Sequence, residues 1–159
     1  MSLEIEQITQ EDQSVVLDIV KHFWGDTMLV IYGEVFHTPD LQGLKAVIEG
    51  KIVGILHYQV SDKVCEIITL ASLHQGQGIG SSLLAHVEAL ARSRQCQKLS
   101  LITTNDNLHA LGFYQRRGFQ LVALHPGQVA ISRQVKPSIP LVGENEIPLR
   151  DELKLEKRI

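Results

Sequence analysis

A glycine-rich turn between two contrasting segments is the feature that most constrains how this chain folds. Residues 75–80 read Gln-Gly-Gln-Gly-Ile-Gly. The preceding residues, 64–70, are rich in β-branched side chains, as is typical of a strand. After the turn, apolar residues recur at the spacing of one helix face, at Leu83, Leu84, Val87, Leu90 and Ala91. The pattern therefore predicts a strand, a tight turn and an amphipathic helix.

Such a turn is suited to hold a phosphate group. The first N–H groups of a helix lack internal partners, and the helix dipole adds partial positive charge at the same end. Glycines let the chain bend sharply and let phosphate oxygens approach the backbone. A glycine cluster in this position can also be only a tight turn, so both interpretations stand at this point.

Length and charge favour one soluble domain. The chain has 159 residues, enough for a full core in a single domain spanning residues 1–159. The formal net charge of −3 gives no general attraction to nucleic acid or to an anionic membrane. The N-terminus lacks a basic region followed by an apolar core, and no stretch approaches the length of a membrane span. We expect a cytoplasmic protein without nucleic-acid or membrane partners.

Cysteine and histidine spacing indicates no metal. Cys65 and Cys96 form no Cys-x-x-Cys pair, so buried thiols are expected rather than a disulfide framework or a zinc site. The seven histidines have no ligand-type spacing with carboxylates or with one another, so they are expected to be surface or packing residues.

Hydrophobic periodicity predicts alternating strands and helices around this turn. An amphipathic helix with Val16, Ile19 and Val20 on its apolar face should end at Trp24-Gly25. A second helix should occupy residues 105–117, with Gly118 as its left-handed cap. The predicted strands cover residues 3–8, 44–49, 52–60, 64–70, 98–104, 119–124 and 149–159, the second to fourth forming an antiparallel meander.

Two segments fall outside this regular pattern. Residues 24–41 are irregular and are predicted to be a substrate-facing loop or a short helix. Residues 125–148 carry four of the five prolines and are predicted to be a long excursion outside the core. Within it, Arg133 and Lys136 could pair with an acidic group on a substrate, or they could simply be solvated.

Two motifs together resemble the GNAT superfamily of acyl-CoA-dependent N-acyltransferases. The family's CoA signature, Arg or Gln followed by x-x-Gly-x-Gly or Ala, corresponds to residues 75–80. A second motif, Asn-x-x-Ala-x-x-Phe-Tyr-x-x-x-Gly-Phe, corresponds to residues 107–119. Either motif is weak evidence alone, but the two occur about thirty residues apart, each in its expected structural context.

The resemblance implies an α/β (α+β) fold, with a mixed, largely antiparallel central sheet flanked by helices. It also implies that acetyl-CoA is the co-substrate. Ile68, Thr69 and Leu70 would offer backbone groups to the pantetheine arm, and Asn107 would bond that arm or cap its helix. Gln75 stands where many members have arginine, and this should weaken CoA binding. The pyrophosphate would be held by Gln75, Gly76, Gln77, Gly78, Ile79, Gly80 and Ser81.

The chemistry of acyl transfer gives two further residues a candidate role. An alkyl amine has a pKa of about 10.4, so its deprotonation must be assisted at neutral pH. Glu66 matches a family position often occupied by a carboxylate and is the candidate base, directly or through a water; it could also be a solvated or ion-paired strand residue. Tyr114 matches the family tyrosine assigned to protonate the leaving thiolate and to contact CoA; ordinary helix packing is the alternative.

The acceptor is less constrained than the donor. The family acylates different amines on one scaffold, so a small-molecule or peptide amine is expected. The resemblance makes a homodimer plausible. Two alternatives stay open: a non-catalytic CoA-binding or sensing module, and a dinucleotide-binding oxidoreductase, since Gly76-x-Gly78-x-x-Ser81 is close to that fingerprint. The second is weaker because an antiparallel meander precedes the glycine run.

Overall fold

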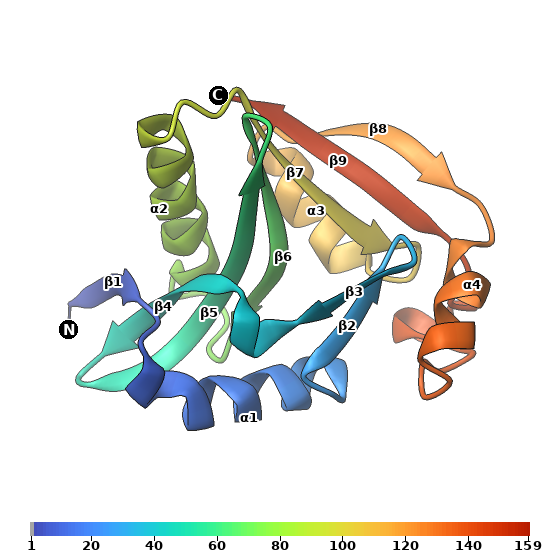
Figure 1. Cartoon of the computed structure of the whole chain (residues 1–159), viewed down its shortest axis with the longest axis horizontal. Coiled ribbons are helices and arrows are strands. Elements are labelled where there is room, and N and C mark those ends of the chain that lie inside the picture. The colour runs from blue at the N-terminus through green and yellow to red at the C-terminus, as the bar shows by residue number, and fades with distance from the viewer. Residues whose placement is uncertain (1) are drawn as a thin grey trace. The chain divides into compact units, whose positions relative to one another are not determined.

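A computed structural model describes residues 2–159, which contain four α-helices and nine strands (Figure 1). The fold class is the predicted one, α/β with a largely antiparallel sheet. The chain divides into two compact units, Met1–Leu29, His37–Leu99 and Ile159 in unit 1, and Val30–Phe36 and Ser100–Arg158 in unit 2. The prediction of a single domain stays a prediction.

Unit 1 is a four-stranded antiparallel arrangement in the order β1-β4-β5-β6. Its elements are β1 (Leu3–Gln7), α1 (Gln13–Trp24), β4 (Gln42–Ile48), β5 (Lys51–Ser61), β6 (Val64–Ser72) and α2 (Ile79–Ser93). The predicted meander is confirmed. Gly25 closes α1 as predicted, in the left-handed conformation, and its N–H donates to the Lys21 carbonyl at 2.8 Å.

Helices cover both faces of the unit 1 strands. On one face, Val16, Ile19 and Val20 of α1 pack against Ile55 and Ala71. On the other face, α2 runs beside the strands (Figure 1). A Cβ on Gly54 would lie 2.5 Å from the Ile79 side chain and 3.2 Å from Leu83, so the absence of a side chain there permits the close approach of α2.

In unit 2, the strand order is β7-β9-β8, and β8 and β9 form an antiparallel pair (Figure 1). The elements are β7 (Lys98–Thr104), α3 (Leu108–Arg116), β8 (Gln120–His125), α4 (Gln128–Val135) and β9 (Glu152–Arg158), with β7 beginning at the end of unit 1. Gly118 follows α3 with a φ of 94°, and its N–H donates to the Gln115 carbonyl at 3.1 Å, as predicted for a cap.

The two irregular segments are more ordered than predicted. Residues 24–41 contain β2 (Met28–Ile31) and β3 (Glu34–His37), which form a two-stranded sheet around Tyr32 and Gly33. Both turn residues have positive φ values, 51° and 75°, which is the geometry of a two-residue hairpin turn. Residues 125–148 contain the helix α4, so this excursion is not structureless.

Candidate active site

The glycine turn has the geometry of an anion cradle. Gly76 and Gly78 have φ values of 75° and 72°, where a side chain would be strained. Gly78 is the N-cap of α2, and its carbonyl accepts the Ser82 N–H at 3.0 Å, so the N–H groups of the first turn precede the helical hydrogen-bond ladder. At both glycines the space that a Cβ would enter is open to 4 Å.

The side chains around these glycines separate into exposed and anchored ones. Gln75 and Gln77 are exposed, and Gly80 and Ser81 are half-buried. Ile79 is 1% exposed and packs toward Gly54, so its side chain anchors the turn and only its backbone can face a ligand. An exposed backbone in a conformation that glycine adopts without strain, with open space at both Cβ positions and the buried Ile79 beside it, fits a diphosphate.

A β-bulge interrupts β6 within the segment predicted to bind the pantetheine arm. His57 pairs with Thr69 and Tyr58 pairs with Ile67, which leaves Ile68 as an extra residue without a partner on β5. Bulges bend a strand and re-aim its side chains, and they are over-represented next to active sites. Ile68 and Thr69 are buried, while Leu70 is half-buried.

The bulge also brings Glu66 and Thr69 to one face of the sheet. Side chains alternate along a regular strand, so residues three positions apart would lie on opposite faces. Here Thr69 pairs with His57 and Glu66 pairs with Gln59, and His57 and Gln59 share a face because they are two positions apart on β5. Glu66 is half-buried on that face, the one that α1 covers at Ile55.

The other two predicted residues lie in unit 2 on α3. Asn107 is the helix N-cap, and its Oδ1 accepts the Ala110 N–H at 3.1 Å, so its side chain has the capping use that was one of the two expected. Tyr114 is buried and contacts Phe113 and Phe119, each with a ring-centroid distance of 5.3 Å. Burial raises the pKa of its phenol well above the usual value of 10.0, so the phenol keeps its proton at neutral pH.

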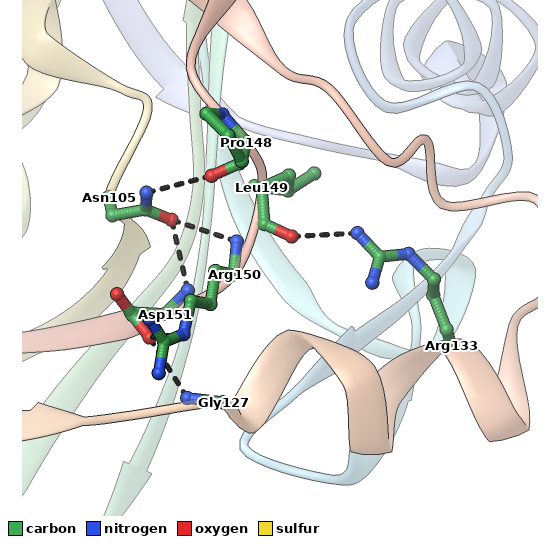
Figure 2. A network of polar contacts seen from close by, with 7 residues as sticks. All are labelled: Asn105, Gly127, Arg133, Pro148, Leu149, Arg150 and Asp151. Carbon is green, nitrogen blue, oxygen red and sulfur yellow. Dashed lines mark hydrogen bonds and ion pairs between the residues drawn. The ribbon is translucent and has the colours of Figure 1, made fainter.

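Arg133 has backbone partners in the structure. Its guanidinium donates to the carbonyls of Ile139 at 3.2 Å, Pro140 at 2.8 Å and Leu149 at 2.7 Å. Figure 2 shows the last of these bonds beside a second network, in which Asn105 donates to the Pro148 carbonyl. These bonds hold the excursion to Leu149, three residues before β9, and the binding of an acidic substrate group by Arg133 stays a hypothesis.

The cysteines are the free, buried thiols that the sequence predicts. Burial, and secondarily the neighbouring Cys96, raises the pKa of Cys65 to about 12, so this thiol is protonated at neutral pH. Within residues 2–159, no group of three or more His, Cys, Asp or Glu side chains is placed to hold a metal ion. In the same residues, no helix combines the length and apolar character needed to cross a membrane.

Comparison with known proteins identifies the family. The model of the Acetyltransferase (GNAT) family matches residues 4–119, which is more than half of the chain. The chain belongs to the GNAT acetyltransferase family. It is thus an enzyme of the acyltransferase class, as the two motifs predicted.

Relatives of this GNAT protein cover most of its length. It is 42% identical over 146 residues to the uncharacterized protein YdhI of Bacillus subtilis, covering 91% of each chain. It is also 25% identical over 137 residues to a spermine/spermidine N(1)-acetyltransferase of the same species, covering 76% of this chain and 89% of the relative.

Solved structures share the fold over nearly the whole chain. An IAA acetyltransferase from Bacillus cereus superposes with a TM-score of 0.74 at 23% identity, covering 99% of this chain and all of the other. A GNAT family acetyltransferase from Elizabethkingia anophelis, crystallised with acetyl-CoA bound, gives a TM-score of 0.71 at 22% identity, covering 99% and 98%. At these identities the likeness demonstrates the fold of this GNAT protein.

Sequence reasoning missed one residue beside the predicted strand segment. His57 is 1% exposed and contacts Thr69, yet its sequence context gave it no more weight than the other six histidines. The signal that could have found it is a lone histidine in the middle of the apolar run 52–60, where a buried polar side chain needs a partner.

Proposed function

We propose that this GNAT protein transfers an acetyl group from acetyl-CoA to a primary amine by direct attack in a ternary complex. The observation that carries the proposal is the pair of left-handed glycines at the start of α2, with open space at both Cβ positions. Together with the bulge at Ile68, this gives unit 1 a backbone suited to a diphosphate followed by an extended arm.

In the proposed reaction, Glu66 acts as the general base, directly or through a water. The amine must lose a proton to expose its lone pair, and a positioned base supplies that step. The amine nitrogen then forms a bond to the thioester carbonyl carbon, and the carbon–sulfur bond breaks. The nitrogen loses its second proton as the amide forms, and that proton replaces the one that Tyr114 gives to the thiolate. Glu66 is half-buried, shares a face of the sheet with Thr69 and lies two residues before the segment assigned to the pantetheine arm, which supports this role.

Tyr114 is the proposed acid for the departing CoA thiolate. A phenol whose pKa is raised by burial stays protonated at neutral pH and is available as a donor. The pyrophosphate is assigned to the backbone from Gln75 to Ser81, and the pantetheine arm to the backbone of residues 68–70. Asn107 is assigned to orient α3 through its cap, with contact to the arm as the alternative.

The proposed acceptor is a small-molecule or peptide amine. One relative at 25% identity is named for acetylation of spermine and spermidine, which makes a polyamine a reasonable first probe. We further propose that the protein acts in the cytoplasm, as one domain and without a metal. We also propose that it forms a homodimer, which the oligomeric state of the purified protein tests.

A thermal-shift titration with acetyl-CoA beside NAD tests the donor. A ligand at 100 times its dissociation constant should add about 2.7 kcal/mol of stability. A shift with acetyl-CoA alone would support the proposal and justify assaying spermidine and peptide amines by thiol release. A shift with NAD alone, or with neither ligand, would contradict it.

Turnover separates the enzyme from its non-catalytic alternative. A CoA-binding or sensing module would bind acetyl-CoA without amine-dependent thiol release. If acetyl-CoA binds and an amine accelerates thiol release, Glu66→Gln should reduce kcat by about two orders of magnitude while leaving acetyl-CoA affinity within a few fold. A kcat equal to that of the wild type would remove Glu66 from the role of base.

A further inference from the structure

A row of three residues crosses the centre of the unit 1 strands. Gly43 of β4 pairs with His57 of β5, and His57 pairs with Thr69 of β6. Residues paired in this way across antiparallel strands place their side-chain positions on the same face. The row ends at the residue that follows the unpaired Ile68, so it adjoins the bulge directly.

His57 and Thr69 make two contacts through one oxygen. The backbone N–H of His57 donates to Thr69 Oγ1 at 2.9 Å, and His57 Nδ1 lies 2.7 Å from the same oxygen. Both residues are 1% exposed. In a regular ladder the His57 N–H would donate to a backbone carbonyl. Here, beside the register shift, it donates to the side-chain hydroxyl of Thr69 instead.

The absence of a side chain at Gly43 provides room for the imidazole ring of His57. A Cβ on Gly43 would lie 3.1 Å from His57 Cδ2 and 2.6 Å from Ile8 Cδ1. The ring thus lies between a position without a side chain on β4 and a hydroxyl on β6, and the contacts between His57 and Thr69 Oγ1 hold the Thr69 side chain in place.

The ring is neutral at physiological pH. Burial lowers the pKa of His57 from 6.5 to about 4, and the neutral imidazole has one nitrogen that can accept a hydrogen bond. The Thr69 hydroxyl can accept the backbone N–H and donate its own proton to Nδ1, which satisfies both groups in a buried site.

We propose that His57 is a positioning residue for acetyl-CoA, acting through the Thr69 hydroxyl to fix the bulged backbone of residues 68–70 on which the pantetheine arm lies. This inference rests on the proposed function, which assigns the arm to that segment. His57 itself touches neither the arm nor the reacting atoms in this proposal.

The test compares two ligands by isothermal titration calorimetry. Acetyl-CoA has the pantetheine arm, whereas adenosine 3′-phosphate 5′-diphosphate is the nucleotide part of CoA without it. Thr69→Val and His57→Leu should each weaken acetyl-CoA binding by about tenfold and leave the nucleotide affinity unchanged, and the double variant should be no weaker than either single one. Thr69→Ser and His57→Asn, which keep a polar atom near the contact, should restore acetyl-CoA binding.

Thr38→Val is the matched control. Thr38 is also 1% exposed in unit 1, and its hydroxyl donates at 3.0 Å to the carbonyl of Thr27, a residue outside β5 and β6. This variant loses one buried hydroxyl bond as Thr69→Val does, yet it should bind acetyl-CoA as the wild type does. An equal loss of affinity in Thr38→Val would overturn the positioning role in favour of general destabilisation.

The outcomes separate the two proposals. Wild-type protein that fails to bind acetyl-CoA overturns the proposed function and this inference with it. Binding by the wild type with undiminished affinity in Thr69→Val and His57→Leu overturns only the positioning role, as does an equal loss for both ligands. If these variants do not fold, nuclear magnetic resonance of the wild type decides: the His57 ring and Thr69 amide signals should shift on adding acetyl-CoA, and signals that stay in place overturn the role.

Discussion

Tyr32 and Glu152 lie 120 positions apart in the chain, yet the Tyr32 backbone N–H donates to both carboxylate oxygens of Glu152, at 3.2 and 3.0 Å. Glu152 is 3% exposed and also accepts from the Ser132 hydroxyl at 3.4 Å. The ring centroids of Tyr32 and His125 are 4.3 Å apart. A buried carboxylate therefore holds the turn between β2 and β3 to the start of β9 within unit 2.

Glu152 makes stability depend on pH. Burial raises the pKa of its carboxyl above 4.5, although the bonds from Tyr32 and Ser132 and the charge of His125 oppose that rise. Because the folded state holds this proton more tightly than the unfolded state, the associated stability is present below pH 4.5 and is lost as pH rises through the folded pKa. As pH rises through the folded pKa of Glu152, the free energy of unfolding of the wild type should fall relative to that of Glu152→Gln. Urea unfolding from pH 4 to 8 measures it.

The exposed Glu4 supplies the control for this comparison. Glu4→Gln makes the same chemical change at a solvated position, so it controls for effects of the substitution that do not depend on burial. A constant difference between the wild type and Glu152→Gln across the same range would contradict the assignment of a buried, ionisable Glu152.

Arg133→Ala should destabilise the protein without changing its affinity for acetyl-CoA. The substitution removes three charge-assisted bonds to the carbonyls of Ile139, Pro140 and Leu149, for an expected loss of about 2 kcal/mol in urea unfolding. Lysine cannot reproduce the planar fork, so Arg133→Lys should recover only part of the stability. Unchanged stability with reduced turnover would return Arg133 to the role of a substrate-binding residue.

The regular elements were predictable because their signals are local. The segment from Val64 to Ala91 carries strand composition, glycines and a helical period in one continuous run, and the structure has the strand, turn and helix there. The same reasoning ended the first helix at Trp24-Gly25 and placed Gly118 as a left-handed cap. Both glycines have positive φ values, since a residue without a Cβ adopts that conformation at least cost.

The site geometry was less predictable because it depends on partners distant in sequence. Nothing in the run Ile67-Ile68-Thr69 distinguishes a bulge from a regular strand, so the shared face of Glu66 and Thr69 follows only from the register against β5. The hairpin around Tyr32 was also missed. Its first turn position is usually Asn, Asp or Gly, and a tyrosine at a φ of 51° is stabilised there by Glu152.

Gly78→Ala should weaken acetyl-CoA binding, and Gly78→Asp should abolish it. A methyl group enters the open space above the turn, and a carboxylate adds repulsion toward the phosphates. Gly127 gives a matched control, because it is the N-cap of α4 with the same φ of 72° and no atom within 4 Å of its Cβ position. Gly127→Ala carries similar strain and should leave the affinity, measured by calorimetry, unchanged. Normal binding by Gly78→Asp would refute the cradle.

Removal of both cysteines should leave turnover intact. The thiol of Cys65 is buried with a pKa of about 12, so it is a poor nucleophile at neutral pH. In the ternary-complex reaction no acyl-enzyme forms, so Cys65→Ala with Cys96→Ala should keep kcat within a few fold while costing about 1–2 kcal/mol of stability from lost packing. Mass spectrometry after incubation with acetyl-CoA provides a second check, since an acetylated cysteine would favour a covalent intermediate.

Tyr114→Phe isolates the proposed acid, because it removes the phenol oxygen and keeps the ring that packs on Phe113 and Phe119. We expect kcat with acetyl-CoA to fall by about two orders of magnitude, with acetyl-CoA affinity nearly unchanged, since proton donation assists departure of the thiolate and not binding of the donor. Tyr58→Phe, at a tyrosine that is 1% exposed on β5, is the matched control and should keep kcat. The decisive comparison uses p-nitrophenyl acetate, whose leaving group departs without a proton. If Tyr114 is the acid, its loss should matter much less for this donor; an equal loss with both donors would mean that Tyr114 only shapes the site.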